Sequence, residues 1–278
     1  MPLLTFIIPI RHQDNAPDWG ALKARMRQTM ASIANQTNPD WRCVIVANEG
    51  ADLPPMPQGF TVRRVTFPPN NMHDLDKAPR EAVLDAFRLD KGRRVLSGML
   101  AAPDSRFFMI VDDDDLVSDN MVEHVARHAG EPGWYVDRGF LWDDQGSWFF
   151  RIDQFDDYCG TSLIIRSDLY GLPPREEDAA IEWIKDMLGS HKRIKPLLAG
   201  RGTPLSPLPF AGAVYRIGSA GSHSKAPGIW KQKFLNRRVL LNPRWLLGNL
   251  RRLTRIGPTQ RREFFGDSSL AQGQETVT

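Results

Sequence analysis

The chain has 278 residues, of which 41% are hydrophobic and 25% charged, a globular composition that excludes disordered, collagen-like and fibrous proteins. No run approaches the roughly 18 apolar residues of a transmembrane helix, so we expect a chain that does not cross a bilayer. The formal net charge of +3 hides an asymmetry. The stretch between Met187 and Arg262 has no Asp or Glu and 16 of the 36 Lys and Arg residues. The remainder has 20 basic and 33 acidic residues, so an acidic body precedes a basic final quarter.

The first half of the chain alternates between predicted strands and helices. Residues 3–10 form a nearly continuous apolar run, typical of a strand covered on both faces. A helix with Asp18 as its N-cap is expected next. Further strands are predicted at 41–47, 61–67 and 107–111, and two separate helices at 80–87 and 93–100. This alternation predicts a doubly wound α/β sheet, whose ligands lie beyond the carboxyl ends of the strands.

The second half has a different character. After a helix capped by Ser118, residues 134–150 alternate aromatic and polar side chains, which indicates antiparallel strands. Additional elements are a strand at 159–166, a helix at 179–188, a strand at 210–217 and a basic helical segment at 230–256, interrupted at 242–243.

The two cysteines, Cys43 and Cys159, lack a CxxC spacing and lie among apolar residues. This pattern predicts buried, reduced thiols rather than a disulfide. No positive charge precedes the first apolar run, as it would in a signal peptide. We therefore expect a cytoplasmic protein.

Four consecutive aspartates, Asp112–Asp115, follow the predicted strand at 107–111. Such carboxylates repel one another strongly unless a cation lies near. Carboxylate oxygens suit Mg²⁺ or Mn²⁺, which keep some waters and take further ligands from a diphosphate. A solvated acidic turn is the alternative. The position at a strand end, where α/β sheets place ligands, favours the metal site.

The segment FFMIVDDDDLV (107–117) resembles the Asp-x-Asp strand of GT-A glycosyltransferases, and the order of the other segments resembles family 2 of these enzymes. The matching pieces are FIIPIR, SIANQT, CVIVANEG, DKGRRVLSGML and CGTSLIIRSDLYG, followed by an acidic pair and a loop histidine. The resemblance covers roughly residues 3–225. It implies a GT-A, Rossmann-like mixed sheet with an antiparallel acceptor-side subdomain.

The resemblance also implies a division of the chain. Residues 1–225 would form the catalytic domain, with 1–117 as its nucleotide-binding half and 118–225 as its acceptor half. Residues 226–265 would form a basic amphipathic helical extension, and 266–278 a flexible tail.

Five residues match family positions near the nucleotide. Pro9 and Arg11 match the first-strand loop, where Arg11 would bring charge to ribose or phosphate. Glu49 stands where the family commonly has an aspartate that binds the nucleobase of the donor. Because of this departure, the identity of the nucleobase stays open. Lys91 and Arg94, in DKGRR, match a basic segment near the nucleotide. Their alternative reading is as surface charges of a helix.

The same comparison implies a metal site. Asp112 would face the ribose or the metal, and Asp114 would bind the metal, whereas a shift of one residue would promote Asp113. His223 resembles the loop histidine that completes the metal shell in several GT-A enzymes; the alternative is a surface histidine without a role. The metal would stabilise the charge that develops on the departing diphosphate.

An inverting transfer also needs a base that takes the proton of the acceptor hydroxyl. The pair Glu177–Asp178 resembles the ED motif of the family, which implies Asp178 as the base and Glu177 as the second choice. Glu176 and Glu182 stay open as candidates, because the following helix is longer than the usual pattern. The alternative is acidic residues that merely stabilise a helix N-terminus.

The extension at 226–265 interleaves apolar with basic residues. It would either pack its apolar face on the catalytic domain or lie on an anionic inner leaflet, close to lipid-linked acceptors. We expect no nucleic acid partner, because no recognition motif accompanies the charge.

These patterns together predict a metal-dependent, inverting glycosyltransferase of hexosyltransferase type. It would transfer a sugar from a nucleotide-diphosphate donor to a glycan or lipid-linked acceptor in bacterial surface polysaccharide synthesis. The expected donor is a UDP-sugar. One rival is a sugar-phosphate nucleotidyltransferase, but residues 11–15 lack the glycines of a triphosphate loop. Another is a non-catalytic glycan- or lipid-binding module on the same fold.

Overall fold

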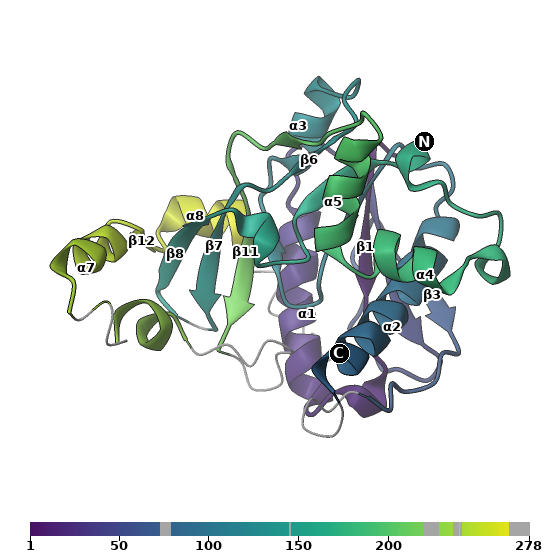
Figure 1. Ribbon diagram of the computed structural model, residues 1–278, viewed down its shortest axis with the longest axis horizontal. Helices are drawn as coiled ribbons and strands as arrows, with labels where there is room; N and C mark the ends of the chain where they lie inside the picture. Colours follow the sequence, from purple (N-terminus) through teal and green to yellow (C-terminus); the bar gives the residue numbers. More distant parts are fainter. Residues whose placement is uncertain (73–78, 145, 219–227, 236–238, 240, 267–278) are drawn as a thin grey trace, which may run out of the picture.

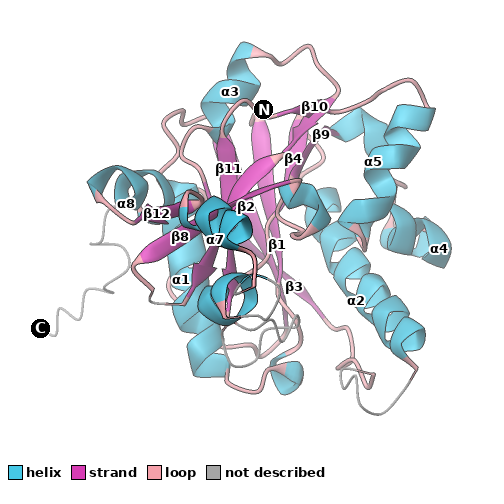
Figure 2. Ribbon diagram, turned by 60° about the vertical axis from the view of Figure 1, so that its left-hand side comes forward, coloured by secondary structure: helices cyan, strands magenta, loops and turns pink. Residues whose placement is uncertain are grey.

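The computed structural model describes residues 1–72, 79–144, 146–218, 228–235, 239 and 241–266. Two β-sheets form its framework, and helices lie on both faces of the larger one (Figure 1, Figure 2). The fold is therefore the mixed α/β, Rossmann-like architecture that the alternation of elements predicts.

The larger sheet has seven strands in the order β10-β6-β9-β4-β1-β2-β3. Four of them are parallel to one another: β1 (Leu4–Pro9), β2 (Trp41–Asn48), β3 (Phe60–Val65) and β4 (Phe107–Ile110). The other three are β6 (Gly133–Tyr135), β9 (Leu163–Arg166) and β10 (Ser206–Pro207). Because β9 runs antiparallel to both β4 and β6, the sheet is mixed.

Two long helices cover opposite faces of the parallel half. Phe6 and Ile8 of β1 share a hydrophobic core with α1 (Trp19–Ala34), whereas Ile7 shares another with α2 (Arg80–Leu100). The Asp18 side chain accepts a hydrogen bond from Ala21 N–H (2.8 Å), which confirms the predicted N-cap.

The chain reverses its winding direction between β1 and β4. It adds β2 and β3 on one side of β1 and then returns through α2 to place β4 on the other side. The carboxyl ends of β1 and β4 are therefore neighbours at a topological switch point, where open α/β sheets form their ligand crevice.

The prediction of two helices between residues 80 and 100 is wrong, because α2 is continuous from Arg80 to Leu100. Its glycine, Gly92, lies within the helix, where a side-chain carbon would meet the Ile184 side chain at 2.6 Å. Gly92 thus allows close packing of another segment on α2, rather than breaking the helix.

The smaller sheet has five strands in the order β12-β8-β7-β11-β5. They are β5 (Leu116–Val117), β7 (Arg138–Asp143), β8 (Trp148–Asp153), β11 (Ala211–Ile217) and β12 (Leu253–Arg255). The antiparallel pairing predicted for 134–150 is confirmed for β7 and β8, although β7 is parallel to β11 and β6 belongs to the larger sheet.

The basic segment is helical only in part. It contains the π-helical turn η6 (Trp230–Phe234) and the helices α7 (Pro243–Leu250) and α8 (Pro258–Phe265). The prediction of helix up to residue 256 is wrong at its end, because β12 pairs with β8 there. Phe264 of α8 is buried against Phe140 and Phe149.

The remaining helices and helical turns are α3 (Met121–Arg127), α4 (Ile181–Trp183), α5 (His191–Gly200), η1 (Gln13–Asn15), η2 (Phe155–Asp157), η3 (Ser167–Tyr170), η4 (Glu176–Asp178) and η5 (Ile184–Leu188). None of the helices described is long and apolar enough to cross a membrane. Cys43 and Cys159 are buried and free, as predicted.

Candidate active site

The acidic run lies at the switch point. Asp112 lies two residues beyond the end of β4, and Arg11 lies two residues beyond the end of the adjacent strand β1. Burial raises the pKa of both Asp113 and Asp114, and the positive charge of Arg11 opposes this rise. The structure therefore brings Arg11 and the aspartates, two predicted parts of the site, to one edge of the sheet.

Asp112 is held by a cation and by a hydroxyl. Lys91 Nζ lies 2.5 Å from Asp112 Oδ1, in an ion pair that links α2 to the end of β4. Asp112 N–H donates a hydrogen bond to Thr161 Oγ1 (2.9 Å). Desolvation lowers the pKa of the partly buried Lys91, but the charge and hydrogen bond of Asp112 outweigh it and raise this pKa above its ordinary value. Lys91 therefore stays charged at this position.

Gly160 leaves room for this ion pair. A side-chain carbon at residue 160 would lie 2.9 Å from Lys91 Nζ and 3.0 Å from Asp112 Oδ2. Any larger residue would therefore press on the ion pair, which explains the glycine beside Thr161.

Asp115 is fully buried and has a structural role. Its Oδ2 accepts hydrogen bonds from Thr161 Oγ1 (2.6 Å) and from the Cys159 thiol (3.0 Å), while its Oδ1 accepts one from Arg216 N–H (3.4 Å). Burial and then the Asp112 charge raise the pKa of Asp115 to about 7, although these hydrogen bonds oppose the rise. Thr161 therefore joins Asp115 to the backbone of Asp112.

Asp113 and Asp114 lie in a field of like charge. Burial raises the pKa of Asp113, and Asp112 raises it further, whereas Arg11 and Arg25 lower it. Burial raises the pKa of Asp114 well above the usual range, and the neighbouring aspartates add to the rise. Their charged forms are disfavoured, so the group is short of compensating positive charge.

Arg216 of β11 supports the run from the second sheet. Its side chain is 1% exposed, and its Nε–H donates to the Asp114 carbonyl oxygen (2.9 Å). The same guanidinium is ion-paired with Asp144, donates to Gln28 Oε1 (2.6 Å) and lies 4.5 Å from the centre of the Trp142 ring. It therefore fixes the backbone of the acidic run rather than facing solvent.

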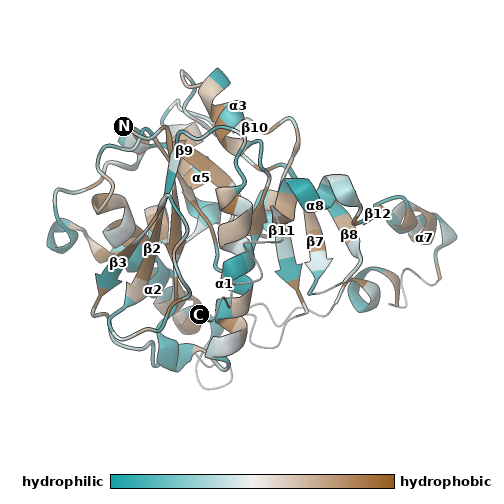
Figure 3. Cartoon of the chain, turned by 180° about the vertical axis from the view of Figure 1, so that it is seen from behind, coloured by the Kyte–Doolittle hydropathy of each residue, from teal (hydrophilic) through white to brown (hydrophobic). Residues whose placement is uncertain are grey.

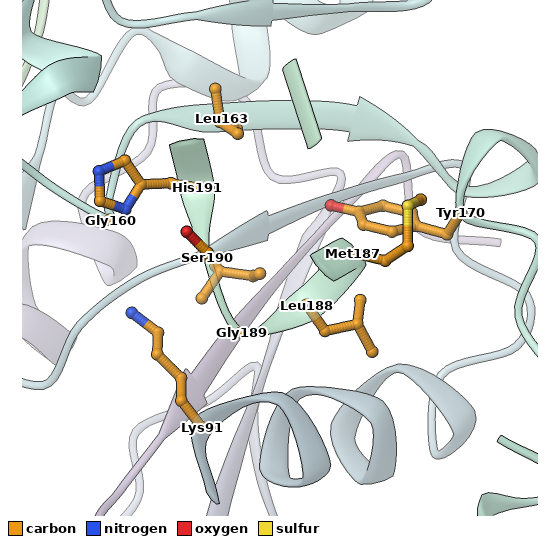
Figure 4. A pocket seen from close by; sticks show the side chains of 10 residues that line it. Lys91, Gly160, Leu163, Tyr170, Met187, Leu188, Gly189, Ser190 and His191 are labelled. Atoms are coloured by element: carbon orange, nitrogen blue, oxygen red, sulfur yellow. The ribbon is translucent and has the colours of Figure 1, made fainter. Parts of the chain in front are cut away.

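A hollow of about 340 Å³, partly open to solvent, lies beside Lys91. Lys91, Ser190 and His191 gather at one end of it, and Tyr170, Met187 and Leu188 at the other (Figure 4). The hollow thus combines a polar end next to Asp112 with an apolar end.

His191 begins α5 at the polar end of the hollow. Its Nδ1 would lie 3.7 Å from a side-chain carbon at residue 160, and its Nε2 is buried with no hydrogen-bond partner among the described residues. Burial and the Lys91 charge lower the pKa of His191 to about 4. The imidazole is therefore neutral at physiological pH.

The other residues predicted for the nucleotide site lie at the ends of β1 and β2 and on α2. Glu49 is exposed directly after β2. Arg94 is 1% exposed and binds Asp90 (Nη2–Oδ1, 3.0 Å) and Asn48 Oδ1 (2.7 Å). Arg94 is thus a buried residue that ties α2 to the end of β2 rather than a surface charge. Pro9 is the last residue of β1.

The candidate bases lie on η4, which packs on α2. Asp178 is ion-paired with Arg175 (2.9 Å), and Glu176 lies 3.5 Å from Arg63 of β3. Glu177 is exposed on the same turn. His223 lies outside the described residues.

Sequence reasoning missed Gly160, Thr161, His191 and Arg216. The first two lie in the segment CGTSLIIRSDLYG, whose resemblance to the family marked the region without giving these residues a role. Within the described ranges, no group of three or more His, Cys, Asp or Glu side chains is arranged to hold a metal ion. Any cation at the acidic run would therefore need ligands beyond these side chains.

No model of a protein family matches the sequence, and no curated protein matches it. Several solved structures are similar to it, and two of them illustrate the degree of similarity. TarS 1–349 from S. aureus, in complex with UDP-GlcNAc, is 15% identical over 81% of this chain and 62% of its own, with a TM-score of 0.44. Rv0371C from Mycobacterium tuberculosis H37Rv, in complex with manganese, is 11% identical over 87% of this chain and 99% of its own, with a TM-score of 0.35. This chain spans less than two thirds of the TarS chain, and similarities of this degree assign neither family nor activity.

Proposed function

We propose that the chain is a metal-dependent glycosyltransferase that moves a sugar from a nucleotide-diphosphate donor to an acceptor hydroxyl. Among such donors, the proposal favours a UDP-sugar. The observation that carries this proposal is the carboxylate group at the switch point between β1 and β4, flanked by Arg11 and Lys91. Carboxylates together with flanking cations suit a diphosphate bound through a divalent ion. The resemblance of FFMIVDDDDLV to an Asp-x-Asp strand supports a nucleotide sugar as the ligand.

The aspartates fit Mn²⁺ or Mg²⁺, because they offer carboxylate oxygens and a dication would offset the burial and the like charges that raise the pKa of Asp114. We assign Asp112 and Asp114 as ligands, Asp113 as the neighbour facing Arg11, and His223 as a further ligand. Water and the donor diphosphate would complete the shell. When bound, the ion neutralises the diphosphate as the sugar leaves.

Several residues would position the donor. Arg11 and Lys91 supply positive charge on either side of the acidic run, toward the diphosphate. Pro9 and Glu49 lie at the ends of β1 and β2, where the nucleoside would bind. Arg94 supports the end of β2 through Asn48, so its role would be to position this edge of the site.

We assign Asp178 as the base that takes the acceptor proton, with Glu177 as the second candidate. Transfer by inversion fits a single base of this kind. Because Asp178 is paired with Arg175, acceptor binding would have to separate the two side chains before the carboxylate can take a proton. The acceptor would be a glycan or lipid-linked hydroxyl of bacterial surface polysaccharide synthesis.

A screen of nucleotide sugars with Mn²⁺ tests the proposal. Release of UDP, GDP or dTDP from one donor, lost on removal of the metal, is the expected result. No binding of any of these nucleotides in calorimetry with Mn²⁺ present would remove the donor site. For the base, Asp178→Asn should lose sugar transfer, and Asp168→Asn should not, since Asp168 is paired with Arg166 on the surface in a similar way. If Asp178→Asn transferred sugar as fast as the control Asp168→Asn, Asp178 would be ruled out as the base.

A further inference from the structure

Large hydrophobic side chains are exposed in one region of the molecule. Six of the eleven such side chains found in the described ranges lie between residues 230 and 250, with exposed fractions from 47% to 79%: Trp230, Leu235, Leu241, Trp245, Leu247 and Leu250. The other five are scattered over the rest of the chain. An apolar patch of this kind on an otherwise polar surface indicates an interaction site.

The exposed residues lie on an ordered framework. The Asn242 side chain accepts hydrogen bonds from Arg244 N–H and Trp245 N–H at the start of α7. Asn249 Nδ2 donates to the Lys233 carbonyl oxygen (2.5 Å), and Leu246 packs on the core. Helix α7 is thus fixed by the face that bears residues 246 and 249. Trp245, Leu247 and Leu250 are about half exposed, at 56%, 51% and 48%.

The charges carried by this segment are all positive, and the carboxylate of Asp153 on the adjacent strand β8 is ion-paired with Arg252 (3.0 Å). Lys231, Arg244 and Arg251 are exposed beside the patch, and the sequence has no acidic residue from 188 to 262. A partner for this surface must therefore combine negative charge with an apolar interior. A second copy that docked this same surface on itself would bring cations against cations, and a nucleic acid would leave the apolar side chains in water.

From these observations we propose that α7 and the preceding turn η6 bind an anionic lipid surface. Trp230, Trp245 and Leu247 would enter the boundary between headgroups and acyl chains, as in other interfacial helices. Arg244 and Arg251 would meet lipid phosphates. The proposal is independent of the glycosyltransferase activity, because it uses none of the site residues.

The position of α7 fits this role. The helix projects at one end of the molecule, beyond β12 and β8, and β3 lies at the other end (Figure 1, Figure 3). Because β12 follows α7 and pairs with β8, the docking helix is tied to the smaller sheet. Binding through α7 would hold the catalytic half at a fixed orientation above the membrane.

Sedimentation of the full chain with vesicles tests the proposal. We compare vesicles of equal parts phosphatidylcholine and phosphatidylglycerol with vesicles of phosphatidylcholine alone. The wild-type chain should bind the anionic vesicles, and this binding should disappear at high salt. Two double variants, Trp245→Ser/Leu247→Ser and Arg244→Gln/Arg251→Gln, should each bind these vesicles at least about tenfold more weakly than the wild-type chain. Matched controls are Ile181→Ser, which is 49% exposed on another helix, and Arg201→Gln, which is exposed in the same acid-free stretch.

Circular dichroism of each variant shows that it is folded, so a loss of binding can be assigned to the surface. Absence of wild-type binding to anionic vesicles overturns the proposal. So does equal loss in the controls. A dimer of the wild-type chain that Trp245→Ser/Leu247→Ser dissociates, without vesicle binding, would assign the patch to a second copy and also overturn it.

Discussion

The end of β4 and helix α7 both concentrate charge of one sign, but the fold treats the two regions in opposite ways. At the end of β4, buried carboxylates are surrounded by specific partners such as Lys91, Thr161 and Arg216. On α7, cations and large apolar side chains are exposed. Carboxylates that are only partly compensated fit the proposed cation and diphosphate, whereas an exposed apolar surface with cations fits a large partner. Substitutions should therefore have large, site-specific effects in the first region and small effects on the isolated protein in the second.

The largest expected effect follows from Asp114→Asn. It removes a proposed metal ligand, so the metal-dependent rate of donor turnover should fall by roughly 100-fold or more. The same change removes a partly buried carboxylate among like charges, so in the absence of metal the free energy of unfolding should rise by about 1 kcal/mol. Initial rates and denaturant unfolding measure the two effects. Asp157→Asn, at an exposed position, is the control. An unchanged rate would show that the buried acidic run is structural.

Thr161→Val tests the hydroxyl that links Asp112 to Asp115 in the acidic run. Valine has nearly the same shape, but Asp112 N–H loses its acceptor and Asp115 loses a donor. The free energy of unfolding should fall by roughly 2–4 kcal/mol, and the rate by about tenfold through displacement of Asp112. Thr161→Val should also weaken the binding of Mn²⁺, whereas Thr161→Ser keeps the hydroxyl and should bind Mn²⁺ as the wild-type protein does. If Val and Ser behave alike in calorimetry with Mn²⁺, the hydroxyl does not position the acidic run.

His191 gives the pH dependence of this region. Its pKa is lowered to about 4 from 6.5, first by burial and then by Lys91, with Lys192 adding and Asp112 and Asp156 opposing. Between these two values the unfolded chain binds the proton and the folded chain does not. The stabilising contribution of the neutral imidazole is therefore present above pH 6.5 and is lost as the pH falls toward 4, by about 3 kcal/mol at most.

Denaturant unfolding at pH values above 6.5 and near 4 checks this expectation. His191→Gln should lessen the loss of stability toward low pH, and His128→Gln, at an exposed position, should leave it unchanged. The same slope in the wild-type protein and in His191→Gln would show that other groups cause the acid sensitivity.

The parallel half of the fold could be predicted from the sequence because it is locally encoded. The buried strands β1, β2 and β4 are continuous apolar runs, and Asp18 marks the start of α1. Since the carboxyl ends of parallel strands meet at one edge, the proximity of Arg11 to the acidic run also followed. Lys91 could be placed there only through the resemblance of DKGRR to the family.

The contacts that the sequence did not reveal depend on residues far apart in the chain. Thr161 and Asp112 are 49 positions apart, and nothing local marks a threonine as the link between two aspartates. Gly92 looks like a helix breaker until Ile184 is packed on it. The three-residue strand β12 follows helical residues and is defined only by its pairing with β8.

The smallest effect is expected from Trp245→Ser/Leu247→Ser in the absence of lipid. Both side chains are about half exposed, at 56% and 51%, so their removal exposes little new apolar surface and leaves no cavity. Serine costs only a few tenths of a kcal/mol in a helix, so the free energy of unfolding should change by about 0.5 kcal/mol or less. Trp142→Ser, at 4% exposure against Arg216, should by contrast cost roughly 3–5 kcal/mol. Denaturant unfolding of the three proteins measures this contrast. A loss on α7 as large as that at Trp142 would mean that the apolar side chains of α7 stabilise the fold itself and are not held free for a partner.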